Sequence, residues 1–270
     1  MSKEAVKFSI ITVTLNPGKA LEKTVSSIES QTYDNYEVII KDGGSTDGSI
    51  SEVSEKNNGK IKVISEKDTG LYDAMNQAVK YATGDFLIFM NAGDCFFSES
   101  VLADVAAGSP AAENTIVYGD AYFCDTETVF KPIPRITAFS CYRNFPCHQS
   151  IFYSKDVLCK KNYDTSFRIR ADYEHFLYSF FKAESKFVYV GFPICRYEGG
   201  GVSEKKENIA LSQKEYKTAV RRYISAPRRF LYRAALILSL YKVRGYLSHS
   251  KTFAGIYSKA VSVVYGMIRK

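Results

Sequence analysis

The nine residues from Phe86 to Asp94 read "FLIFMNAGD". Five apolar residues without a break predict a strand that lies inside the protein. The run then ends in Asn91 and Asp94, whose amide and carboxylate groups are costly to bury without partners. In an open parallel sheet, ligands bind at the carboxyl ends of the strands. The stretch therefore predicts a central strand that stops at the floor of a ligand crevice.

Strand and helix signals alternate through the first hundred residues, which predicts a parallel sheet with helices on both faces. The first helix is indicated by Leu21, Val25 and Ile28, which recur at i, i+4 and i+7. The second is expected to begin with Asp73 as its N-cap and to run to about Ala82. The predicted strands of this part are Lys7–Asn16, Tyr36–Asp42, Lys60–Ser65 and Phe86–Met90.

The alternation loosens in the second half of the chain. Thr115–Phe123 and Lys186–Gly191 are strand-like, and Ala171–Ala183 has the pattern of a helix. We expect this half to complete the sheet and to form the second wall of the crevice.

The loop "DGGSTDG" (Asp42–Gly48) follows the second predicted strand and is rich in Gly and short oxygen-bearing side chains. It does not fit an EF-hand calcium loop, because Gly44 and Thr46 stand where ligands are needed. The loop also matches neither the P-loop pattern GxxxxGK[ST] nor the dinucleotide-binding pattern GxGxxG. Asp47 is explained equally well as a helix cap, whereas Asp42 at the strand end is better placed to contact a ligand.

The basic charge of the chain belongs to its C-terminal tail. Of the net charge of +7, the part from Lys214 to the end contributes +12 and residues 1–213 contribute −5. Arg clusters alternate with apolar residues there, which is typical of a helix at an anionic membrane surface. Packing of this segment on the main domain, with a solvated basic face, is the alternative. No nucleic-acid-binding motif accompanies the charge, so no nucleic-acid partner is expected.

The six cysteines form no CxxC pair and stand mostly among apolar or aromatic residues. We interpret them as reduced core thiols of a cytosolic protein, with a disulfide framework or a zinc site as the alternatives. The chain does not open with the basic and apolar regions of a signal peptide. The longest apolar stretch of the tail, Ala234–Leu240, is shorter than the ~20 residues of a membrane span.

Four stretches of the chain form a recognisable series: "FSIITVTLN", "QTYDNYEVIIKDGGSTDGS", "GLYDAMNQAVKYATGDFLIFMNAGD" and "ADYE". They occur in the order found in bacterial family 2 glycosyltransferases with the GT-A fold, which the chain resembles over roughly residues 7–203. The resemblance is to the branch that builds exopolysaccharide, colanic-acid-like or O-antigen repeat units. It implies a mostly parallel nucleotide-binding sheet flanked by helices, an α/β architecture.

The resemblance implies a nucleotide-sugar donor, most often UDP-linked, whose base is read by Asp42. It also implies a divalent metal, Mn²⁺ or Mg²⁺, that offsets the charge of the leaving diphosphate. Of the two or three carboxylates that the family's acidic motif usually carries, "NAGD" retains Asp94, which we predict to be the metal ligand. The other residues expected to contact the donor are Thr14, Asn16, Asp68, Asp73 and Asn91.

An inverting transfer needs one carboxylate to take the proton of the acceptor hydroxyl. By resemblance this general base is Asp172 in "RADYEHF", with Glu174 as its substitute. An N-cap of the following helix is the alternative explanation for Asp172. The stretch "CHQS" resembles a segment that faces the acceptor, which implies that His148 and Gln149 contact it.

The sequence thus predicts an inverting glycosyltransferase that moves a sugar to a lipid-linked oligosaccharide in surface polysaccharide biosynthesis. We expect a catalytic domain over 1–203, with a nucleotide-sugar half (1–114) and an acceptor half (115–203), and a membrane-association tail over 204–270. The protein would be cytoplasmic and peripheral on the inner face of the cell membrane. A sugar-phosphate nucleotidyltransferase and an inactive membrane-bound scaffold are the alternatives, and association into a homo-oligomer stays open.

Overall fold

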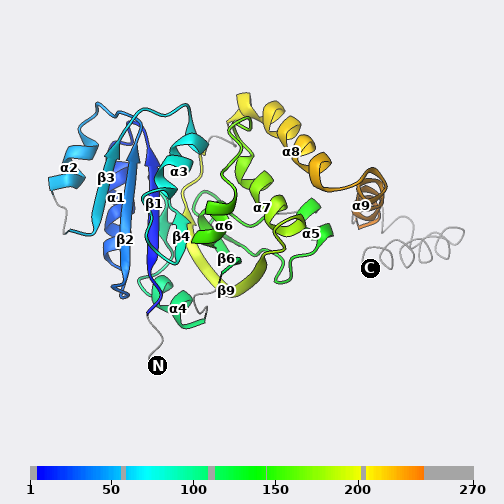
Figure 1. The fold of residues 1–270 in the computed structure, drawn as a ribbon, viewed down its shortest axis with the longest axis horizontal. Coiled ribbons are helices and arrows are strands. Elements are labelled where there is room, and N and C mark those ends of the chain that lie inside the picture. Colours follow the sequence, from blue (N-terminus) through cyan, green and yellow to red (C-terminus); the bar gives the residue numbers. More distant parts are fainter. Residues whose placement is uncertain (1–4, 56–58, 109–112, 144, 202–204, 240–270) are drawn as a thin grey trace, which may run out of the picture.

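A computed structural model of the chain describes residues 5–55, 59–108, 113–143, 145–201 and 205–239. One mixed sheet runs through the molecule in the strand order β3-β2-β1-β4-β8-β6-β9-β5, with β7 paired to β6. Its parallel part is blue to cyan in Figure 1, and its mixed part is green to yellow. The second half therefore completes the sheet, as predicted.

The parallel part is built from four strands whose prediction is confirmed. They are β1 (Phe8–Thr14), β2 (Tyr36–Asp42), β3 (Ile61–Ser65) and β4 (Phe86–Phe89). All four residues of β4 are fully buried, and the strand lies between β1 and β8. The register pairs Thr14 with Asp42 and Asp42 with Ser65, so the polar strand ends lie side by side.

Helices cover both faces of these strands. Helix α1 (Lys19–Glu29) buries its apolar stripe against one face, which includes Ile10. Helix α3 (Leu71–Val79) packs on the opposite face, which includes Ile11. Neighbouring residues of a strand point to opposite faces, so burial of both faces explains why each strand is apolar throughout.

Helix α3 begins three residues earlier than predicted, so the prediction of Asp73 as its N-cap is wrong. Gly70 occupies its N-cap position, and Asp73 lies in its first turn, where its carboxylate accepts a hydrogen bond from the Thr69 N–H (2.8 Å). The helix ends at Val79, before the predicted Ala82.

The mixed part of the sheet contains three strands that the sequence did not predict: β5 (Cys95–Phe96), β7 (Thr128–Phe130) and β8 (Ile151–Ser154). Strand β8 (Ile151–Ser154) is fully buried and pairs antiparallel with both β4 and β6 (Thr115–Phe123). Strand β9 (Lys186–Tyr197) pairs parallel with β6 and is longer than predicted. The smaller elements are α2 (Ser49–Glu55), β5 (Cys95–Phe96), α4 (Val101–Gly108), β7 (Thr128–Phe130), α5 (Ala138–Arg143), η1 (His148–Ser150), α6 (Lys155–Lys160) and η2 (Lys206–Asn208).

The described part of the predicted tail forms two helices, α8 (Ile209–Tyr223) and α9 (Ala226–Ser239). Helix α8 lies beside α7 (Ala171–Phe181), and its buried Ala219 and Val220 belong to the core that α7 also joins (Figure 1). The alternative of packing on the main domain therefore holds for this part of the tail. No described helix is both long enough and apolar enough to cross a membrane, and residues 240–270 of the predicted tail lie outside the described residues.

All six cysteines are free thiols, as predicted. Cys95, Cys141 and Cys195 are buried, whereas Cys159 is exposed, so the prediction that the cysteines belong to the core is wrong for Cys159.

Candidate active site

A cavity of roughly 270 Å³ opens where the two parts of the sheet meet, and it brings together four of the predicted site residues. Helix α3 and the loop before α7 supply much of its wall. The predicted residues that line it are Asn91, His148, Gln149 and Asp172. We refer to this cavity as the crevice.

Asp172 is the second residue of α7 and is partly exposed in the crevice. The N-cap position belongs to Arg170, so capping does not explain Asp172. Its Oδ1 accepts a hydrogen bond from the Tyr72 hydroxyl at 2.8 Å, whereas Oδ2 has no partner among the described residues. One oxygen is therefore held in place, and the other can accept a proton from a bound molecule.

Tyr72, which the sequence analysis missed, orients this carboxylate from α3. Its hydroxyl lies 2.8 Å from both Asp172 Oδ1 and the Ile169 carbonyl oxygen, and it donates to one of them at a time. Burial, together with the Asp172 charge, raises the pKa of Tyr72 well above its usual range, so the hydroxyl remains a donor. No sequence signal marks this residue, because the bond links positions that are far apart in the chain.

Two polar groups in the crevice wall are buried without partners among the described residues. They are both ring nitrogens of His148 and the Oδ1 atom of Asn91. The His148 ring stacks on Phe89 with centroids 5.2 Å apart, and burial lowers the pKa of the imidazole, so it is neutral at pH 7. Buried polar atoms normally have hydrogen-bond partners, so a ligand in the crevice would supply what these atoms lack.

Asp94 lies behind this wall and is only 5% exposed. Its Oδ1 accepts a hydrogen bond from the Glu198 N–H, and its Oδ2 accepts one from Gln149 Nε2, both at 3.0 Å. Burial raises the pKa of the Asp94 carboxyl to about 6. The carboxylate thus fixes Gln149 and the chain after β9, and it does not line the crevice.

These contacts do not suit the metal predicted for Asp94. A hard dication needs several oxygen ligands that are free to coordinate it. Within the described ranges, no group of three or more His, Cys, Asp or Glu side chains could hold a metal ion. Both oxygens of Asp94 are engaged with protein donors, and the neighbouring Asn91 and Gly93 carry no charge.

Three residues predicted to contact the donor, Thr14, Asn16 and Asp42, lie at the carboxyl ends of β1 and β2. Asp42 is 2% exposed, and its Oδ1 accepts hydrogen bonds from the Ser45 N–H (2.8 Å) and hydroxyl (2.6 Å). Burial alone would raise the pKa of Asp42, but these bonds outweigh it and lower the pKa. Asn16 Oδ1 accepts a bond from the Thr46 N–H (2.8 Å), and Thr14 is the register partner of Asp42.

Asp68 and Asp73 organise the loop between β3 and α3. The Asp68 carboxylate lies 3.5 Å from the buried Lys41 ammonium and accepts a hydrogen bond from the Gly70 N–H at 3.0 Å. Asp73 bonds to Thr69 in the same loop. The structure thus gives both residues local partners, and their contact with a donor stays a prediction.

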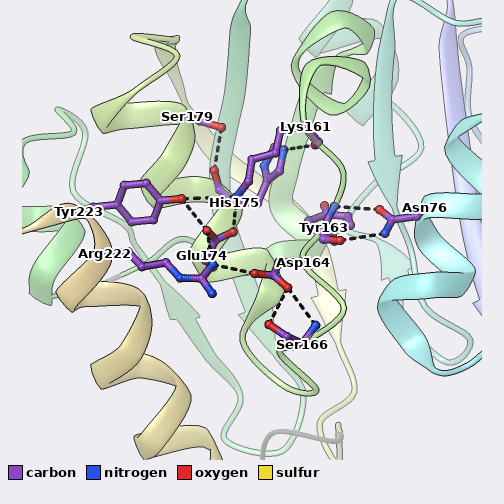
Figure 2. A network of polar contacts seen from close by, with 10 residues as sticks. All are labelled: Asn76, Lys161, Tyr163, Asp164, Ser166, Glu174, His175, Ser179, Arg222 and Tyr223. Carbon is purple, nitrogen blue, oxygen red and sulfur yellow. Dashed lines mark hydrogen bonds and ion pairs between the residues drawn. The ribbon is translucent and has the colours of Figure 1, made fainter.

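Glu174, the predicted substitute base, lies outside the crevice and is 1% exposed. Figure 2 shows its carboxylate among the side chains of Lys161, Arg222 and Tyr223. The Tyr223 hydroxyl donates at 2.5 Å and the Arg222 guanidinium at 3.1 Å. Because both come from α8, Glu174 anchors α8 to α7, and its position does not support the catalytic role.

Comparisons with known proteins agree on one family. Residues 9–173 match the family described as "Glycosyl transferase family 2". The chain is 34% identical over 205 residues to "PGL/p-HBAD biosynthesis glycosyltransferase" of Mycobacterium bovis, an alignment that covers 74% of this chain and 80% of the relative. It is 32% identical over 94 residues to "UDP-Glc:alpha-D-GlcNAc-diphosphoundecaprenol beta-1,3-glucosyltransferase WfgD" of Escherichia coli, which covers 34% of this chain and 37% of that protein.

Two solved structures share the fold at low sequence identity. The structure of S. aureus TarS 1–349 in complex with UDP-GlcNAc has a TM-score of 0.64 and 16% identity, and the match covers 97% of this chain and 81% of that chain. The mannosyltransferase PcManGT from Pyrobaculum calidifontis, in complex with GDP-Man and Mn2+, has a TM-score of 0.55 and 14% identity, with 96% and 86% covered.

The raised pKa of Asp94 predicts a stability effect that depends on pH. The folded carboxyl titrates near pH 6 and the unfolded one near 3.8, so wild type loses stability as the pH rises through this window. Asp94→Asn does not titrate there and keeps both bonds if the Gln149 amide turns over. Between pH 4.5 and 7.5, its free energy of unfolding should gain about 2 kcal/mol relative to wild type. Urea denaturation at both pH values measures this, and a constant difference would contradict it.

Proposed function

The chain belongs to glycosyltransferase family 2, and we propose that it is an inverting enzyme that transfers a sugar from a UDP-linked donor to a lipid-linked oligosaccharide. It has the GT-A fold of the glycosyltransferases that it matches in structure. The reaction would add a hexosyl or N-acetylhexosaminyl unit during surface polysaccharide biosynthesis.

The observation that carries the proposal is the free Oδ2 atom of Asp172 in the crevice. In the proposed step, this oxygen takes the proton of the acceptor hydroxyl while the hydroxyl oxygen attacks the anomeric carbon of the donor. The new glycosidic C–O bond forms as the bond from that carbon to the diphosphate oxygen breaks. The nucleoside diphosphate leaves with the bonding electron pair, and the configuration at the anomeric carbon inverts. The Tyr72 hydroxyl keeps Oδ1 fixed and so aims Oδ2 during the step.

The carboxyl ends of β1 and β2 are the proposed site for the nucleoside. Asp42 supplies a fixed carboxylate that can accept a base N–H, and Thr14 and Asn16 stand beside it. The complexes of TarS with UDP-GlcNAc and of PcManGT with GDP-Man support a nucleotide sugar as the donor. We propose UDP as the nucleotide because the TarS complex contains UDP-GlcNAc.

The acceptor is proposed to enter the crevice from the side of η1. His148 and Asn91 present buried polar atoms without partners among the described residues there, which suits the hydroxyl groups of a sugar. A lipid-diphosphate-linked acceptor is supported by WfgD, whose name specifies such a substrate.

A divalent metal is common among GT-A enzymes, and the PcManGT complex contains Mn2+. No step of the present proposal passes through a metal, because the contacts of Asp94 do not suit one. Mn²⁺ or Mg²⁺ at Asp94 stays a prediction from the sequence.

The exposed side of α8 and α9 is the proposed contact with the inner face of the cell membrane. Phe230 is 77% exposed, and Arg221, Arg229 and Arg233 line the same shallow groove. Cationic side chains around an exposed aromatic ring suit an anionic lipid surface. The buried side of α8 stays on the catalytic domain, so the membrane would hold the crevice near its lipid-linked substrate.

Both alternatives predicted from the sequence are less well supported. Membership of family 2 speaks against a sugar-phosphate nucleotidyltransferase. An inactive scaffold has no use for a carboxylate that keeps one oxygen free in a crevice while a second residue orients the other.

Asp172→Asn should lower kcat by about 100-fold or more, the usual contribution of a general base, and leave UDP affinity unchanged. Glu174→Gln is the matched control, since it removes a carboxylate two residues away that lies outside the crevice. It should keep kcat and lose about 1–3 kcal/mol of unfolding free energy, because it weakens a buried hydrogen-bonded group. Transfer assays measure kcat, calorimetry with UDP measures its affinity, and urea denaturation measures the free energy of unfolding. Unchanged turnover in Asp172→Asn would show that Asp172 is not the general base.

The membrane contact predicts that charge reversal on α8 and α9 releases the protein from anionic vesicles. The full chain should float with phosphatidylglycerol vesicles, and Arg221→Glu/Arg233→Glu should not, because two attractive charges become repulsive. Lys67→Glu/Lys80→Glu makes the same change of charge beside α3 and should still float. Flotation of all three proteins alike would count against this surface.

A further inference from the structure

The loop that leads into α7 contributes further residues to the lining of the crevice, besides Asp172 on the helix itself. Arg168, Ile169 and Arg170 line the cavity just before Asp172 in the chain. Arg168 and Arg170 are the cationic side chains of the lining, since His148 is neutral. A loop of this kind holds its shape only if its backbone N–H groups find partners.

The carboxylate of Glu215 binds three consecutive N–H groups of this loop. Its Oε1 accepts from Arg168 N at 2.8 Å, and its Oε2 accepts from Ile169 N and Arg170 N, each at 2.9 Å. Glu215 is 7% exposed and comes from α8. Successive N–H groups around one anion form a rigid arrangement, comparable to an anion-binding nest.

The same loop is held from two further sides. The Arg170 side chain donates from Nε to the Ser212 hydroxyl of α8 at 2.9 Å. The Tyr72 hydroxyl reaches the Ile169 carbonyl and Asp172 from α3. The loop is thus fixed between α8 and α3, and Asp172 lies directly after the fixed part.

We infer that Glu215 is a positioning residue for sugar transfer: from α8, it fixes the backbone that aims Asp172 and turns Arg168 and Arg170 toward the crevice. This inference rests on the proposed function. The leaving diphosphate gains negative charge in the transition state, and a guanidinium suits phosphate oxygens. The Glu215 carboxylate, which lies outside the crevice, therefore positions both the base and the two arginine side chains nearest to it. The helix that begins the predicted tail is part of the catalytic apparatus.

A merely structural role for Glu215 would make it equivalent to other residues that fasten α8. Arg222 provides the comparison, because its guanidinium also joins α8 to the domain, through Glu174 and Asp164 (Figure 2). Neither of these partners lines the crevice. Glu215→Gln and Arg222→Gln each remove one charge that holds α8, and only the first should misplace the base.

The test compares the full chain with Glu215→Gln, Arg222→Gln and Asp172→Asn, each assayed well below its own melting temperature. The amide introduced by Glu215→Gln places an N–H donor against backbone N–H groups, so kcat should fall by up to about 100-fold, the cost of a displacement near 1 Å. The donor KM should stay close to that of wild type, because nucleoside recognition lies at β1 and β2. Arg222→Gln should lower the melting temperature and keep kcat.

The outcomes separate the inference from the proposed function. If Glu215→Gln loses no more kcat than Arg222→Gln, or if its loss lies wholly in the donor KM, the inference is wrong while an inactive Asp172→Asn still upholds the proposed function. If Asp172→Asn turns over like wild type, or if wild type transfers no sugar from any nucleotide donor, both are wrong. Hydrogen exchange of the segment 168–170 gives a readout besides activity: it should accelerate in Glu215→Gln and not in Arg222→Gln.

Discussion

The hydrogen bond between the Tyr72 hydroxyl and Asp172 joins the two halves of the fold at the crevice. Tyr72 belongs to a helix that covers the parallel strands, and Asp172 belongs to the helix of the second half. A general base must keep a free oxygen and yet be held in one orientation. The Asp172 carboxylate meets both needs, because the buried Tyr72 hydroxyl binds its Oδ1 atom and its Oδ2 atom stays unbound among the described residues.

The polar end of β4 serves this arrangement indirectly. Asp94 is buried and holds Gln149 and the chain after β9, so it connects the end of β4 to the η1 side of the crevice. Asn91, three residues earlier, keeps its Oδ1 atom without a partner among the described residues. In "FLIFMNAGD", the Asp94 carboxylate therefore binds protein donors behind the wall, and the Asn91 amide lines the crevice.

Strands and helices with a regular pattern of apolar residues could be predicted from the sequence. Features that depend on contacts between residues far apart in the chain could not. The parallel strands were predictable because burial of both faces leaves an unbroken apolar run. Strand β8 was not, since a buried run of four residues carries no periodicity. Asp172 and Glu174 stand two apart on a helix and so point to different sides, which a motif does not reveal. Glu215 binds backbone N–H groups, and its one signal was that it is the only acidic residue from Lys214 to the end of the sequence.

We propose a single carboxylate as the base of one in-line displacement, which inverts the configuration at the anomeric carbon. The most direct measurement is the anomeric configuration of the first product formed from an α-linked UDP-sugar, read by proton NMR before any isomerisation. Inversion gives a β-linked product. An α-linked product would contradict it, because retention requires two displacements or a different arrangement of groups around the anomeric carbon.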